Sequence, residues 1–131
     1  MAKVDYSKDD DYYNQDFERE NFVSIWLGLC GEDDDLDADV LQDMCGVGYY
    51  NVDEQESNFF DFELVSVEKL IGDLSYSNSF IEDVVEAARK KGIVEARWVT
   101  AQYDFDYDPA KVSRAILQDP IYIGSFPYLK E

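Results

Sequence analysis

Alternating apolar positions and short runs of β-branched and aromatic residues predict four strands. The most apolar run, FVSIWLGL at residues 22–29, predicts a central strand that ends before Gly31. The other three predicted strands alternate around Phe60, Phe62 and Leu64, cover residues 93–107, and start at Ile121. We expect the polar residues 1–20 to form an N-terminal arm whose aromatic side chains, Tyr12, Tyr13 and Phe17, can pack on the folded part.

Helical periodicity appears first in the Asp-rich segment EDDDLDADVLQDMCG. Its apolar residues Leu36, Val40, Leu41 and Met44 share one helical face. The Asp residues crowd the first turns, where the helix dipole favours negative charge. We therefore expect a helix that ends at Gly46.

Three further helical segments are predicted in the second half of the chain. VEKLIGDL after Ser66 predicts a short helix. A capping box that starts at Ser79 predicts a longer helix, with basic residues in its last turn and Gly92 as its end. Asp108 and Pro109 are a typical N-cap and first position of a brief helical turn.

The order of these elements predicts the fold class. Strand, helix, strand, helix, helix, strand, strand, without a repeated strand–helix–strand spacing, favours an α+β fold. We expect a small mixed or antiparallel sheet of about four strands with helices packed on one face. The 131 residues suit one compact core, so residues 21–131 are expected to form a single domain.

The charge of the sequence identifies the predicted domain as strongly acidic. The chain has 30 Asp and Glu against 11 Lys and Arg, a net charge of −19. Residues 1–63 hold 19 acids and 3 bases, a net of 3 − 19 = −16, whereas residues 64–131 hold 11 acids and 8 bases, a net of −3. This field makes direct binding of nucleic acid improbable and favours a basic partner.

Several function classes are excluded by residues that the sequence lacks. Without histidine, no Ser-His or Cys-His nucleophile and no imidazole metal site can form. Cys30 and Cys45 are too few for a disulfide framework or a zinc site. No segment has the length of a signal peptide or a membrane helix, so a cytoplasmic location is expected.

Two acidic motifs invite a metal or catalytic interpretation. An EF-hand loop that started at Asp33 would need Gly and Glu where Ala38 and Met44 stand, so the match fails. Asp104, Asp106 and Asp108 should share one side of a strand, with Phe105 and Tyr107 on the other, which an ordinary half-buried strand explains. We therefore expect neither enzymatic activity nor a cofactor or metal.

Two remaining motifs have simpler explanations. Gly46-Val47-Gly48 lacks the context of a phosphate-binding loop and is best interpreted as a turn. Trp26 and Trp98 lie in apolar strands and are expected in the core.

Four segments together suggest a family: VSIWLG at residues 23–28, LSYSNSFI at 74–81, YDFDY at 103–107 and IGSFPY at 123–128. Their order and spacing resemble immunity protein family 22 of bacterial polymorphic toxin systems. The resemblance implies a small cytoplasmic protein that neutralises a cognate toxin by binding it. It transfers no binding or catalytic residue, because the matching motifs belong to the framework.

Charge and position select the candidate binding residues. The first hypothesis is an immunity protein whose acidic surface occupies the basic cleft of a toxin, with a nuclease as the expected class. The alternative is an acidic regulator or nucleic-acid mimic that binds a host nucleic-acid-binding protein. A third possibility is a small metal-dependent hydrolase built on the Asp clusters. The partner-binding candidates are Asp33, Asp34, Asp35, Asp37, Asp39, Tyr49, Tyr50, Asp53, Glu54 and Glu56.

Overall fold

The computed structural model describes residues 15–29, 41–42, 45–61, 63–112, 116 and 120–129. The strands are β1 (Glu18–Gly28), β2 (Gln55–Phe59), β3 (Val65–Ser66), β4 (Glu95–Ala96), β5 (Trp98–Phe105) and β6 (Ile121–Pro127). The helices are α1 (Val67–Gly72) and α2 (Ile81–Lys90), with 3-10 turns η2 (Val52–Glu54), η3 (Ser77–Ser79) and η4 (Pro109–Lys111).

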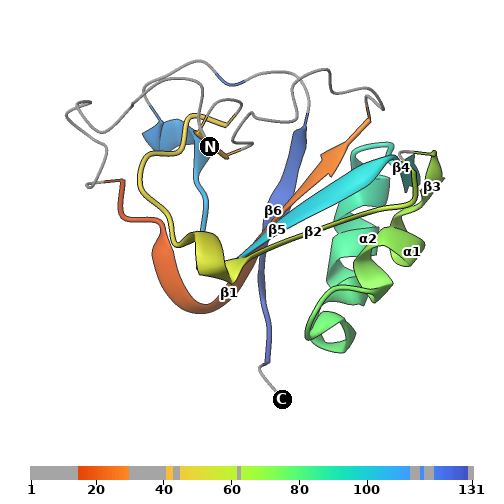
Figure 1. Ribbon diagram of the computed structural model, residues 1–131, viewed down its shortest axis with the longest axis horizontal. Coiled ribbons are helices and arrows are strands. Elements are labelled where there is room, and N and C mark those ends of the chain that lie inside the picture. The colour runs from red at the N-terminus through yellow and green to blue at the C-terminus, as the bar shows by residue number, and fades with distance from the viewer. Residues whose placement is uncertain are drawn as a thin grey trace.

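The predicted α+β fold class is confirmed. Four antiparallel strands form the main sheet in the order β2-β5-β1-β6, and β3 and β4 form a separate two-stranded sheet. In Figure 1, α1 and α2 lie together on one side of the main sheet, next to β3 and β4. Within the described part of the chain, none of the helices has the length and apolar composition of a membrane span.

Alternation along β1 divides the interior into two clusters. Val23, Ile25 and Leu27 face the helices and belong to the larger cluster, which includes all the buried side chains of α1 and α2. Trp26 points the other way, into a smaller cluster with Phe17. Residues 22–29 were predicted as the central strand, and β1 does lie between β5 and β6, but it begins earlier, at Glu18.

Helix boundaries follow the sequence signals at Ser66, Gly92 and Asp108. The Ser66 hydroxyl caps α1 by accepting from the backbone N–H of Lys69. Gly92 ends α2 with φ +80°, while Ile93 N donates to the Ala88 carbonyl. Asp108 caps η4, as predicted.

The capping box predicted at Ser79 is wrong. Phe80 occupies the N-cap position of α2, and no side chain caps that helix. The Ser79 hydroxyl instead donates to the Tyr76 carbonyl and accepts from the backbone N–H of Leu129. Its hydrogen bonds therefore fix the 3-10 turn η3 and the chain that follows β6.

Two strand predictions also need correction. The second strand is β2 at Gln55–Phe59 rather than the predicted segment around Phe60 and Leu64, because Phe60 starts a turn in which Glu63 N donates to its carbonyl. Phe62 of that prediction lies outside the described residues. The predicted strand over residues 93–107 is divided into β4 and β5. Arg97 interrupts it, since its backbone N–H turns to the Gly28 carbonyl.

The end of the predicted Asp-rich helix lies near the N-terminal segment. Gly46 has φ +74°, and the N–H groups of Cys45 and Val47 both donate to the Leu41 carbonyl, which agrees with the predicted stop. The buried Gln15 side chain donates to the Gly46 carbonyl and accepts from the Gly48 N–H. Residues 32–40, 43 and 44 of the predicted helix lie outside the described part of the chain.

Candidate functional site

A pocket of about 280 Å³ lies where η2 and β2 meet the turn that joins α1 to η3. It is lined by Asp53, Glu54, Glu56, Ser75, Tyr76 and Tyr103. Three of these residues are acids that the sequence predicted as partner-binding. The fold therefore brings three of the candidate residues to one concave site, together with two tyrosines and a serine from later in the chain.

Glu56 is held in place at this pocket by three hydrogen bonds. Its Oε1 accepts from the Ser75 backbone N–H at 2.8 Å and from the Tyr103 hydroxyl at 2.7 Å. Its Oε2 accepts from the Ser75 hydroxyl at 2.9 Å. A carboxylate offers about four lone-pair positions, so Oε2 retains the capacity for a further donor.

These bonds set the protonation states of both partners. Partial burial acts to raise the pKa of Glu56, but the hydrogen bonds from Tyr103 and Ser75 outweigh it and leave the pKa below its ordinary value of 4.5. Burial, and then the bond to Glu56, raise the pKa of Tyr103 above its ordinary value. At neutral pH the pair is therefore an ionised carboxylate that accepts from a neutral hydroxyl.

Tyr76 presents an aromatic ring at the rim of the pocket. It is 39% exposed and adopts a left-handed backbone conformation with φ +62°, which is uncommon for a bulky residue. Its ring packs against Tyr103, with centroids 6.0 Å apart, and against Tyr128 at 5.8 Å. The rings of Tyr103 and Tyr128 therefore hold the exposed Tyr76 ring in place on its inner side.

The remaining predicted residues lie elsewhere. Tyr49 is 49% exposed, whereas Tyr50 is partly buried against the smaller core cluster. Neither lines the acidic pocket. Asp33, Asp34, Asp35, Asp37 and Asp39 lie outside the described residues.

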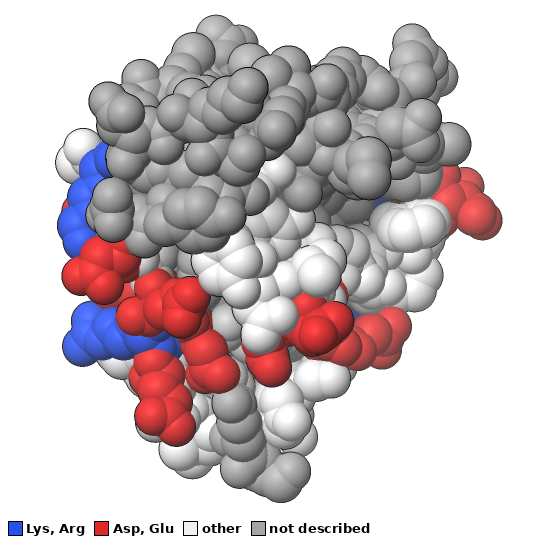
Figure 2. All heavy atoms as spheres, turned by 60° about the vertical axis from the view of Figure 1, so that its left-hand side comes forward, with Lys and Arg blue, Asp and Glu red and all other residues white. Residues whose placement is uncertain are grey.

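Acidic side chains on the visible surface occur in groups. Figure 2 shows the face at the left of Figure 1, where Asp and Glu form several separate clusters with Lys or Arg beside those at one edge. Within η2, Asp53 is exposed and Glu54 half-buried. No hydrogen bond to either carboxylate is found from another described residue, so both can meet an external donor.

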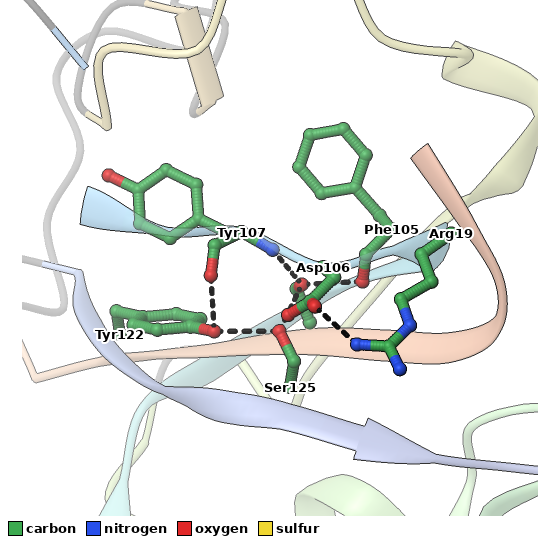
Figure 3. A network of polar contacts seen from close by, with 7 residues as sticks. Arg19, Phe105, Asp106, Tyr107, Tyr122 and Ser125 are labelled. Atoms are coloured by element: carbon green, nitrogen blue, oxygen red, sulfur yellow. Dashed lines mark hydrogen bonds and ion pairs between the residues drawn. The ribbon is translucent and has the colours of Figure 1, made fainter. Parts of the chain in front are cut away.

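Asp104, Asp106 and Asp108, at the end of β5 and just after it, do not form a catalytic cluster. Asp104 Oδ1 accepts from the Tyr128 hydroxyl at 2.8 Å, and Asp108 caps Ala110. Asp106 forms a 3.0 Å ion pair with Arg19, which Figure 3 shows beside the end of β5. Each carboxylate thus has its own structural partner.

Phe105 and Tyr107 share one side as predicted, but the strand that carries these acids is irregular at Asp104, which the prediction did not foresee. Asp104 has φ +54°, and the pairing of β1 with β5 shifts register at the same place. Tyr103 consequently faces the larger core cluster, while Phe105 and Tyr107 face the smaller one. The irregular residue reverses the alternation.

A buried polar network fixes the end of β5 after this irregularity (Figure 3). The Ser24 hydroxyl donates to the Phe105 carbonyl at 2.7 Å and accepts from Tyr107 N at 3.0 Å. The Tyr122 hydroxyl, within 2.7 Å of the Ser125 hydroxyl, donates to the Tyr107 carbonyl. All these polar groups find partners inside the protein, so the network is structural.

Among the described residues, no group of three or more Asp, Glu or Cys side chains converges closely enough to hold a metal ion. The three carboxylates of the pocket therefore surround a space without meeting at one point. Trp26 is buried in the core as predicted, whereas Trp98, also predicted there, is half-buried and belongs to neither core cluster. Cys45 is a buried free thiol.

Comparison with known proteins decides the family. A family model described as Immunity protein 22 matches residues 32–128, about three quarters of the chain. The chain belongs to the Immunity protein 22 family. No curated protein and no solved structure matched the chain. The family assignment confirms the resemblance seen in the sequence, and it implies a cognate toxin as the partner.

Within this Immunity protein 22 fold, sequence reasoning missed half of the pocket. Ser75 and Tyr76 belong to the segment LSYSNSFI and Tyr103 to YDFDY, which served only as marks of the family resemblance, and neither was predicted as a binding segment. The one available signal was an aromatic residue among small polar ones in a turn. Only the fold shows that this turn lies against η2 and β2.

Proposed function

We propose that this chain binds and neutralises a basic bacterial toxin, and that the toxin is a nuclease. Family membership supports the immunity function. The net charge of −19 supports a basic partner, because opposite fields accelerate association and orient the two proteins. A nuclease fits this charge because its own substrate is a polyanion.

The proposed binding surface is centred on the acidic pocket. Asp53 and Glu54 carry carboxylates open to an external donor, and Tyr76 adds an exposed aromatic ring of the kind enriched in binding hot spots. Tyr49, an exposed tyrosine that precedes η2 in the sequence, is a further candidate contact outside the pocket. The segment 33–39 would add further negative charge to the field that guides the toxin.

We propose inhibition by occupation rather than by catalysis. An acidic surface that covers the substrate cleft of a nuclease excludes nucleic acid by sterics and by charge. The chain contains no histidine to serve as a general base, and Asp104, Asp106 and Asp108 each have a structural partner. The site of action would be the cytoplasm, where a nuclease toxin meets nucleic acid.

Co-expression with the cognate toxin domain tests the proposal. We expect a stable one-to-one complex on size-exclusion chromatography, loss of nuclease activity in the complex, and restored growth of cells that carry both genes. An inactive toxin variant should bind equally well. If the two proteins neither associate nor restore growth, the immunity function is wrong and a host-directed acidic mimic becomes the better hypothesis.

A further inference from the structure

The acidic pocket has the composition of a receptor for one extended cation. Asp53, Glu54 and Glu56 lie around a space of about 280 Å³ with the exposed ring of Tyr76 at its rim. Carboxylates and an aromatic face are the two groups that attract a cationic side chain in proteins.

The arrangement of the carboxylates distinguishes between kinds of cation. A calcium or magnesium ion needs several oxygens converging on one point, and the described acids do not converge in this way. A guanidinium group instead has five N–H donors spread over a planar fork, and it can reach separate acceptors at once. An ammonium group is a compact point charge and can satisfy fewer of them.

We propose that this pocket receives a single arginine side chain of the toxin, with its guanidinium directed to Glu56 and to the η2 carboxylates and stacked on Tyr76. The inference rests on the proposed immunity function for the identity of the partner. It deepens that function, since it specifies the group of the toxin that the acidic surface recognises.

Glu56 is prepared for this role before the partner arrives. Ser75 and Tyr103 occupy three of its lone-pair positions and leave capacity on Oε2, so its carboxylate is fixed in one orientation. A fixed acceptor loses little conformational entropy on binding. Tyr103 and Ser75 are therefore positioning residues, while Asp53, Glu54, Glu56 and Tyr76 contact the arginine.

Nuclear magnetic resonance titration of the free protein tests the pocket without the toxin. The probe is N-acetyl-arginine methylamide at low ionic strength, compared with the lysine and norleucine analogues. We expect amide shift changes with the arginine analogue at residues 53–56 and 75–76, smaller changes with the lysine analogue, and none with norleucine. Glu54→Gln and Tyr76→Leu should each weaken the arginine response severalfold.

A matched control is the Glu95→Gln variant, whose exposed carboxylate lies on β4 outside the pocket. It should bind the arginine analogue like the original chain. Shift changes spread over all acidic regions, or equal responses to arginine and lysine, would overturn the arginine pocket. A complex with the toxin that forms normally with Glu54→Gln and Tyr76→Leu would also overturn it while leaving the immunity function intact. Failure of the toxin to bind the original chain would instead refute the immunity function.

Discussion

The Tyr103 hydroxyl lies 2.7 Å from Oε1 of Glu56 and joins the core of the protein to its acidic pocket. Tyr103 projects from the central strand β5 into the larger core cluster, whereas Glu56 belongs to the edge strand β2. The same hydroxyl is 2.8 Å from the Ser75 carbonyl. One buried side chain thus holds both walls of the pocket, the strand and the interhelical turn.

Replacing Tyr103 by Phe should separate these walls. We expect the free energy of unfolding to fall by about 1–2 kcal/mol, because the variant leaves the Ser75 carbonyl and the carboxylate without their shared donor. The pKa of Glu56 should rise, since one of the bonds that lowers it is removed. Urea denaturation measures the first effect and carbon-detected NMR titration the second. Tyr76→Phe removes a hydroxyl at the same pocket that bonds to no described residue, and it should change neither quantity.

Stability should depend on pH through Glu56. Its pKa in the folded protein lies below the ordinary value of 4.5, so its bonds stabilise the fold fully above that value. The contribution is lost as the pH falls through the lowered pKa. Glu56→Gln should therefore be less stable than the original chain at pH 7, and the difference should shrink in acid. Unfolding curves from neutral pH to below the lowered pKa measure it. A difference that stays constant over this range would exclude the role given to Glu56.

Gly28 tests the packing of the two central strands. A methyl group there would overlap the indole of Trp98, its partner on β5. Gly28→Ala should lower the free energy of unfolding by about 1–3 kcal/mol, as overpacking does. Gly72→Ala is the matched control, because the methyl group added there would lie 4.0 Å from Cδ1 of Ile81, an ordinary van der Waals contact. That variant should be as stable as the original chain or slightly more stable in the same urea experiment.

Ser24 tests the network at the end of β5. Its fully buried hydroxyl serves both the Phe105 carbonyl and Tyr107 N, so Ser24→Ala leaves buried polar groups unpaired. We expect a loss of about 1–3 kcal/mol in the free energy of unfolding. Ser57 lies on the exposed edge strand β2, and Ser57→Thr keeps a hydroxyl beside its partner Thr100, so this control should cost less than about 0.5 kcal/mol. Equal losses in the two variants would contradict the structural role of the network.

The sequence predicted elements well where local chemistry decides their limits. Gly92 ends α2 because its left-handed conformation is cheap only for glycine, and Asp108 caps η4 through its own side chain. The strand at Ile121 is also where periodicity placed it. Such signals depend on a few neighbouring residues, so they survive without knowledge of the tertiary structure.

Prediction failed where tertiary pairing decides the outcome. β2 is a polar edge strand without apolar alternation, and only its pairing with β5 makes it a strand. Ser79 has the pattern of a helix cap, but it bonds instead to Leu129 from the end of the chain. The pocket follows the same rule: charge identified Glu56, but nothing local in the sequence places Tyr103 beside it.

The association rate of the cognate toxin domain with charge-reversed variants tests whether the acidic pocket binds the toxin. Asp53→Lys with Glu54→Lys, and Glu63→Lys with Glu95→Lys as control, both change the net charge from −19 to −19 + 4 = −15. Both pairs are to be measured by stopped flow at low and high salt. We predict that the pocket pair slows association and abolishes protection from the toxin, while the control pair retains protection and loses only the modest rate expected from total charge. Full protection by the pocket pair, or equal loss in both pairs, would contradict binding at the acidic pocket.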